Sequence, residues 1–256
     1  MFISDLIEPF DPRTREYLHE AVRSLPQEGP PRITIIKQAQ GGVRADKRNV
    51  LGVLPASFNP PTVAHQALLR EADKTVAFDE ILLILDQQAM DKEYFGAPLE
   101  DRLLMLLVFF GGDPRISLGI SNRGLFLDKV EALQHMYPRD TQIYFIVGYD
   151  TIVRVLDHRY YEDREEALRS LFSQAGFLVA NRGDCGKAEL TELFEREENR
   201  PFAAQVSTLT LSTDLAGISS SQVRRRLAEG KSIKDLIPPT LEEFLRKRRF
   251  YSRQGP

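Results

Sequence analysis

Short apolar segments alternate with helical patterns from residue 49 onward, and this alternation constrains the fold more than any other feature of the sequence. Nearly all-apolar strands separated by helices are typical of a parallel sheet covered on both faces. The sequence therefore predicts an α/β fold: a Rossmann-like, doubly wound parallel sheet with helices on both faces and ligands beyond the carboxyl ends of its strands. The expected strands are residues 50–55, 81–86, 115–120, 142–147, 177–181 and 204–211, and the expected helices are residues 63–74, 98–110, 125–136, about 150–173, 187–199, 219–229 and 240–249.

The first 48 residues differ from this pattern. Residues 12–24 have the apolar spacing of an amphipathic helix, residues 33–36 form a short strand candidate, and residues 41–48 have the polarity of a connector. We interpret residues 1–48 as an extension packed on the main domain, which comprises residues 49–256.

Composition narrows the classes of function. The formal net charge of -3 argues against sequence-independent binding to nucleic acid. No apolar run reaches the length of a membrane span, and the amino terminus lacks the basic-then-apolar order of a secretory signal. The single cysteine, Cys185, fits a reducing compartment. We expect a cytoplasmic protein that binds neither nucleic acid nor membrane, and the sequence leaves its oligomeric state open.

The segment from Ala56 to His65 follows the first strand of the main domain and carries the richest chemical signal. Small residues at its start let a turn bring backbone N–H groups close to a ligand. Thr62 can cap the following helix, and it shares one face of the first turn with His65, three residues later. The amides and dipole of that turn favour a phosphate whose charge grows during displacement. For Thr-x-x-His alone, a capping threonine and a buried histidine would be the simpler explanation.

A second candidate phosphate site lies near the carboxyl end, at Gly217 to Leu227. Serines that open a helix offer hydroxyls and unpaired amides to phosphate oxygens. Arg224 lies one helical turn after Ser220 and can direct its planar fork at the same oxygens. A well-capped surface helix with solvated arginines would explain this segment equally well if it stood alone.

Together the two segments resemble the nucleotidyltransferase superfamily that shares the (H/T)-x-G-H loop and the Ile-Ser-Ser-Thr-x-x-Arg motif. The string Ser-Phe-Asn-Pro-Pro-Thr-x-x-His at residues 57–65 is most similar to nicotinamide and nicotinate mononucleotide adenylyltransferases, and residues 150–161 resemble their fungal-type branch. Three positions depart from the superfamily pattern: Ala56 stands where glycine is common, Ala64 stands before the histidine, and Ser221 replaces threonine. Alanine would hinder the approach of backbone to ligand if residue 56 required a positive φ.

The resemblance also implies roles for individual residues. It implies catalytic roles for Thr62, His65 and Arg224. Gly148 and Asp150 match a Gly-x-Asp that touches the nucleotide in the family, and the acceptor site would include Lys92, Arg102 and Thr151. The implied ATP-binding residues are Ser57, Phe58, Asn59, His65, Gly148, Asp150, Ile218, Ser219, Ser220 and Arg224.

The activity implied is adenylyl transfer from ATP to nicotinamide or nicotinate mononucleotide by direct in-line displacement, giving a dinucleotide and pyrophosphate. Magnesium would arrive with ATP and bind mainly to phosphate oxygens and water, which explains why the sequence shows no carboxylate cluster. A cytidylyltransferase and a pantetheine-phosphate adenylyltransferase share the two phosphate sites and stay open as alternatives. A non-catalytic nucleotide-binding homologue is the third, with Ala56 as its best argument. The sequence does not separate the amide from the acid form of the acceptor.

Overall fold

The computed structural model describes residues 11–43, 49–87, 96–181, 186–248 and 251. Its centre is a seven-stranded sheet of order β1-β4-β3-β2-β5-β6-β7. All neighbouring strands run parallel except β1, which pairs antiparallel with β4 at one edge. The strands are β1 Ile33–Lys37, β2 Val50–Pro55, β3 Glu80–Asp86, β4 Ile116–Ser121, β5 Gln142–Gly148, β6 Ala175–Ala180 and β7 Val206–Leu209.

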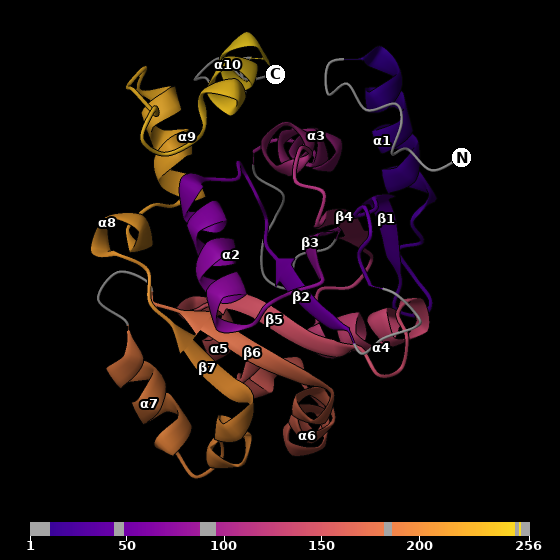
Figure 1. Cartoon of the computed structure of the whole chain (residues 1–256), viewed down its shortest axis with the longest axis vertical. Coiled ribbons are helices and arrows are strands. Elements are labelled where there is room, and N and C mark those ends of the chain that lie inside the picture. Colours follow the sequence, from indigo (N-terminus) through magenta and orange to yellow (C-terminus); the bar gives the residue numbers. More distant parts are fainter. Residues whose placement is uncertain (1–10, 44–48, 88–95, 182–185, 249–250, 252–256) are drawn as a thin grey trace.

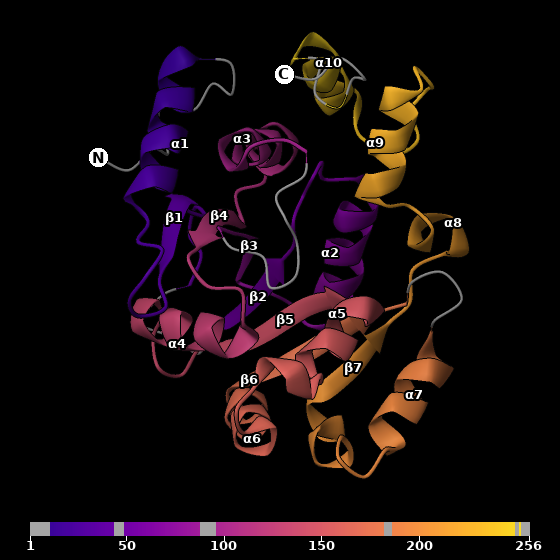
Figure 2. The same cartoon turned by 180° about the vertical axis from the view of Figure 1, so that it is seen from behind.

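Helices cover both faces of the sheet, as the sequence predicts (Figures 1 and 2). The apolar side chains of one face pack with α1 Pro12–Ser24, α2 Val63–Thr75, α3 Leu99–Phe110, α8 Thr213–Ala216, α9 Ser220–Ala228 and α10 Pro239–Arg248. Those of the other face pack with α4 Phe126–Met136, α5 Tyr149–Val155, α6 Arg164–Gln174 and α7 Lys187–Glu195. Leu83 and Leu85 of β3 enter the first cluster, and Leu82 and Ile84 enter the second, so alternation along a strand divides the core.

The order of the strands places a topological switch point at β2. The chain runs from β2 outward through β3 and β4, and then returns to the other side of β2 for β5, β6 and β7. In open α/β sheets such a reversal leaves a crevice beyond the carboxyl ends of the strands. Figure 1 shows that the segment after β2 leads into α2, and that α9 lies beside α2.

The structure corrects three expected elements. The helix expected at about 150–173 is divided into α5, a 3-10 turn at His158–Tyr160 and α6, because Asp157 and Asp163 each cap a new turn with their side chains. The helix expected at 187–199 ends at Glu195. The strand expected at 204–211 shortens to β7, which follows a second 3-10 turn at Arg200–Gln205.

The described part of residues 1–48 packs against the main sheet. Leu18 and Leu25 of the α1 segment are buried in the same core cluster as α3. The carboxylate of Glu80, at the amino end of β3, accepts hydrogen bonds from Val43 N at 3.1 Å, Ser117 Oγ at 2.6 Å and Tyr137 OH at 2.8 Å. These contacts support the proposal that residues 1–48 are an extension of the main domain.

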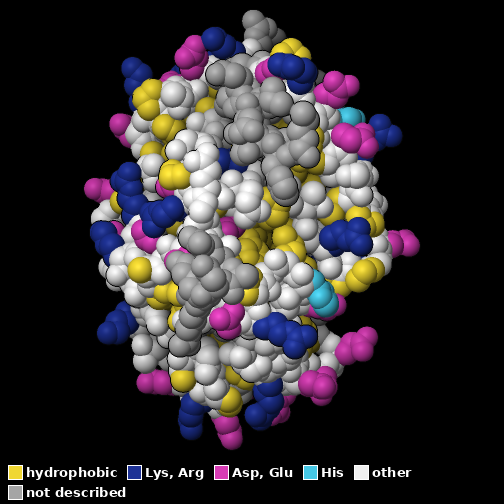
Figure 3. Space-filling model, turned by 45° about the vertical axis from the view of Figure 1, so that its right-hand side comes forward, with side chains coloured by type: hydrophobic (Ala, Val, Ile, Leu, Met, Phe, Trp, Pro, Cys, Tyr) yellow, Lys and Arg dark blue, Asp and Glu magenta, His cyan; other side chains and the backbone are white. Residues whose placement is uncertain are grey.

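Two features bear on membrane and nucleic-acid binding. Within the described ranges, no helix combines the length and apolar character needed to cross a bilayer. Figure 3 shows basic and acidic side chains interspersed over the face that it draws, with hydrophobic side chains between them.

Candidate active site

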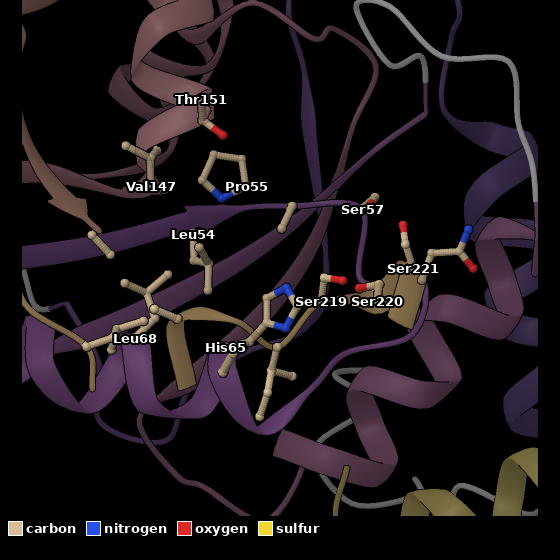
Figure 4. A pocket seen from close by; sticks show the side chains of 18 of the residues that line it. Leu54, Pro55, Ser57, His65, Leu68, Val147, Thr151, Ser219, Ser220 and Ser221 are labelled. Carbon is tan, nitrogen blue, oxygen red and sulfur yellow. The ribbon is translucent and has the colours of Figure 1, made fainter. Parts of the chain in front are cut away.

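A cleft of about 420 Å³ opens at the carboxyl edge of the sheet, at the switch point. This volume lies in the range of about 300–1,000 Å³ that is typical of small-ligand sites. Among the residues expected from sequence, those that line the cleft are Ser57, Asn59, His65, Arg102, Gly148, Thr151, Ile218, Ser219, Ser220 and Arg224. Figure 4 shows His65 on the same side as Ser219 and Ser220, with Thr151 across the cleft.

Buried side chains of the loop between β2 and α2 hold this loop in place. Phe58 has a φ of 42° and is fully buried, with its ring 5.0 Å from that of His65, so the Phe58 side chain supports the histidine. The buried Asn59 side chain accepts from Ala97 N at 3.2 Å and Tyr251 OH at 2.5 Å. Ala56 does not have a positive φ, so alanine at this position brings none of the backbone strain considered above.

Thr62 and His65 form a hydrogen-bonded pair at the start of α2. The backbone N–H of Thr62 donates to His65 Nδ1 at 3.0 Å, and Thr62 Oγ1 lies 2.8 Å from the same nitrogen. Donation to Nδ1 requires an unprotonated Nδ1, so Nε2 carries the proton of the neutral ring. The Thr62 side chain is fully buried, whereas His65 lines the cleft. Thr62 is absent from the described lining of the cleft, so of this pair it is His65 that faces a ligand there.

The two candidate phosphate segments meet in space, although about 160 residues separate them. Ser220 Oγ donates to the carbonyl of Pro60 at 2.8 Å, and Arg224 Nη1 donates to the carbonyl of Asn59 at 2.6 Å. Arg224 Nη2 also donates to Ser221 Oγ at 3.0 Å. The amino ends of α2 and α9 consequently border one cleft.

These contacts refine the roles of the two serines. Ser220 directs its single hydroxyl proton at Pro60, so any phosphate contact from this residue would come from its backbone N–H at the start of α9. Ser219 caps α9, because its Oγ accepts from Gln222 N at 3.2 Å. Accepting that bond leaves the Ser219 hydroxyl able to donate.

The remaining expected residues differ in position. Gly148 ends β5, and a Cβ built there would meet nothing within 4 Å, which leaves open space for a ligand beside it. Asp150 is exposed and does not line the cleft. Arg102 is buried and lines the cleft, and its Nη1 donates to the carbonyl of Ser57 at 3.2 Å. Lys92 lies outside the described residues.

Sequence reasoning missed an ion pair at the end of β3. Asp86 lines the cleft, and its Oδ1 lies 2.8 Å from Nζ of the fully buried Lys129. Burial raises the pKa of the Asp86 carboxyl above its ordinary value, and the nearby charges of Lys129 and Arg102 oppose this rise. The signal was available: Lys129 lies three residues after Phe126 and four before Leu133, on the apolar stripe of its helix.

The described residues of the cleft are compatible with magnesium carried by a polyphosphate. Within the described residues, no three His, Cys, Asp or Glu side chains cluster as metal ligands. Among the described residues that line the cleft, Asp86 is the one carboxylate, and Lys129 is already paired with it. Magnesium commonly takes one or two carboxylates together with phosphate oxygens and water, and this donor set is compatible with that arrangement.

A doubly wound sheet with two helix amino termini at its switch point defines the class of nucleotide-binding α/β proteins. The chain belongs to the cytidylyltransferase-like family, whose model matches residues 53–226. The protein is therefore an enzyme, a nucleotidyltransferase.

The relatives of the chain narrow its assignment within this family. A Dehalococcoides mccartyi protein with the provisional name nicotinate-nucleotide adenylyltransferase is 27% identical over 79% of this chain and 97% of its own length. A Schizosaccharomyces pombe protein with the provisional name nicotinamide mononucleotide adenylyltransferase is 28% identical over 70% of this chain and 76% of its own. The chain is thus a distant homologue of these adenylyltransferases.

Solved structures show the same fold. The nicotinic acid mononucleotide adenylyltransferase of Plasmodium falciparum, complexed with NaAD, superposes with a TM-score of 0.59 at 18% identity, covering 79% of this chain and 97% of the other. A second structure of that enzyme, complexed with APC, gives a TM-score of 0.58 with the same coverage at 17% identity.

Proposed function

We propose that the protein transfers the adenylyl group of ATP to the phosphate of nicotinamide or nicotinate mononucleotide, releasing pyrophosphate and forming a pyridine dinucleotide. The observation that carries this proposal is the junction of the two phosphate segments, in which Ser220 and Arg224 hold the carbonyls of Pro60 and Asn59. The names of the relatives supply the choice of acceptor. The activity would belong to the synthesis of NAD.

Positioning and charge stabilisation would account for catalysis, because direct displacement needs no protein nucleophile. The Nε2–H of His65 would donate to the α-phosphate as its negative charge grows. Thr62 would act as a positioning residue, since it fixes Nδ1 as the acceptor and so turns Nε2–H toward the cleft.

The start of α9 would hold the leaving pyrophosphate. Its first backbone N–H groups, the Ser219 hydroxyl and the Arg224 guanidinium can all donate to phosphate oxygens. A guanidinium carries five N–H groups, so Arg224 can bind protein and phosphate together. Magnesium carried by the polyphosphate would supply further charge neutralisation.

The acceptor would occupy the half of the cleft next to β3 and α4. In-line displacement puts the attacking and leaving oxygens on opposite sides of the phosphorus. With pyrophosphate at α9, the acceptor phosphate would approach from the opposite side, and Arg102, which lines the cleft and acts on the Asp86 carboxyl, would supply a cation to it. Asp86, Gly124 and Phe126 line the cleft in this half and would surround the rest of the acceptor.

The test is a comparison of acceptors with the full-length protein. Pyrophosphate release would be followed with Mg-ATP and, in turn, nicotinamide mononucleotide, nicotinate mononucleotide and phosphopantetheine, and with CTP and a phospho-alcohol. We expect the pyridine mononucleotides to give the highest kcat/KM. Faster transfer to phosphopantetheine, or from CTP, would replace this proposal with one of the two other transferase assignments.

A further inference from the structure

The acceptor half of the cleft has a wall built on the ion pair between Asp86 and Lys129. Lys129 is fully buried, whereas 24% of the Asp86 side chain is exposed. Besides Asp86 Oδ1 at 2.8 Å, Lys129 Nζ contacts the carbonyls of Arg123 at 3.1 Å and Gly124 at 2.7 Å. An ammonium has three N–H groups, and these three partners match them. Lys129 is therefore committed to the protein and holds the loop before α4 against the end of β3.

Within this ion pair, Oδ2 of Asp86 is the atom that a ligand can reach. Oδ1 is shut off from solvent, so the exposed part of the side chain includes Oδ2. Burial raises the pKa of the Asp86 carboxyl, and the adjacent Lys129 ammonium opposes this rise. In the ionised form that pairs with Lys129, the carboxylate accepts hydrogen bonds and donates none. Gly124 and Phe126, which line the cleft beside it, have no side-chain donor. Among Asp86, Gly124 and Phe126, the one polar side chain is therefore an acceptor, whereas the Arg102 cation of this half is assigned to the acceptor phosphate.

We propose that Asp86 selects an acceptor whose pyridine ring carries a carboxamide over one that carries a carboxylate. The amide NH2 group donates to Asp86 Oδ2, whereas a carboxylate has no proton to donate and brings a like charge against Asp86. This inference rests on the proposed function, because it takes a pyridine mononucleotide as the acceptor. A hydrogen bond to a charged group predicts a preference of about 10- to 100-fold for the amide.

The test measures binding and turnover separately. The dissociation constants of nicotinamide and nicotinate mononucleotide would be measured by calorimetry, and kcat/KM for both would be measured with Mg-ATP. In the wild-type chain we expect the amide preference in both quantities. Asp86→Asn should reduce that preference to less than about threefold, because the new amide can donate to a carboxylate. The matched control Asp128→Asn removes a neighbouring carboxylate that does not line the cleft, and it should keep the preference.

A double variant separates a loss of amide preference from a loss of stability. Asp86→Asn leaves Lys129 without its ionic partner, which destabilises a buried cation. Asp86→Asn with Lys129→Met removes both charges together and should show the same loss of amide preference.

Each outcome either supports or overturns the selective role of Asp86. An equal or stronger affinity for nicotinate mononucleotide in the wild type, or binding of neither ligand, overturns the inference. Equal weakening of both ligands by Asp86→Asn also overturns it, because Asp86 would then contact a group that the two share, such as the ribose. Amide-selective binding that Asp86→Asn abolishes, without transfer to either acceptor, would uphold Asp86 as the selector and reject the proposed adenylyl transfer.

Discussion

His65 owes its orientation to its neighbours. The Thr62 N–H fixes which ring nitrogen is protonated, and the buried Phe58 ring supports the imidazole from behind. In the proposed mechanism, a neutral histidine held in this way would present a fixed donor, which would cost no reorganisation when the transition state forms. A protonated ring would carry a hydrogen on Nδ1 and lose the bond from the Thr62 backbone.

His65→Ala should lower kcat about 100-fold or more, with a modest change in ATP affinity, as expected for a contact made mainly in the transition state. Thr62→Val keeps the backbone donor and removes the hydroxyl, so its loss in kcat should be only several-fold. Initial rates of pyrophosphate release and calorimetric ATP affinities would measure both effects. Near-normal transfer by His65→Ala would show that the assigned role of this residue is wrong.

The elements that build the cleft are joined by side-chain to backbone bonds. Ser220 connects α9 to the loop before α2, and Tyr251 reaches the same loop through Asn59. The position of the proposed pyrophosphate site would therefore depend on contacts between elements that are far apart in the sequence.

Ser220→Ala removes the bond to Pro60 and should raise KM for ATP several-fold, while stability falls by about 1 kcal/mol. Steady-state kinetics and urea unfolding would measure the two effects. Ser207→Ala, at an exposed position of β7, is the control and should change neither. If Ser220→Ala left KM unchanged, the bond would have no part in ATP binding.

Most of the sheet and the helix starts that carry the two candidate phosphate segments could be predicted from sequence, because apolar runs and helix-opening motifs are local signals. The expected strand at residues 50–55 coincides with β2, and the two segments lie at the starts of α2 and α9. The Asp86–Lys129 pair was missed because it depends on a contact between residues 43 positions apart. The break between α5 and α6 was missed because capping by Asp157 and Asp163 competes with an otherwise helical pattern.

At the scale of the whole molecule, the candidate active-site cleft and the Glu80 hydrogen-bond cluster lie at opposite ends of the strands. The cleft lies at the carboxyl ends of the strands, and Glu80 lies at the amino end of β3, where it holds Val43, Ser117 and Tyr137. Burial raises the pKa of the Tyr137 hydroxyl, and the adjacent Glu80 raises it further, so Tyr137 stays protonated and donates.

Glu80→Gln places an amide NH2 against groups that already donate, so we expect stability to fall by about 1–3 kcal/mol. The values of kcat and KM at a temperature where the variant stays folded should match the wild type, because the cluster is remote from the cleft. Chemical denaturation and kinetics would measure these quantities, with the exposed Glu131→Gln as control. A large loss of kcat in the folded variant would contradict this separation of roles.

The most direct measurement is a crystal structure of the protein with magnesium and a non-hydrolysable ATP analogue. The account predicts the α-phosphate within hydrogen-bond distance of His65 Nε2, and the β- and γ-phosphates against the first turn of α9 and Arg224. A polyphosphate bound outside the cleft, or touching only one of the two segments, would contradict it.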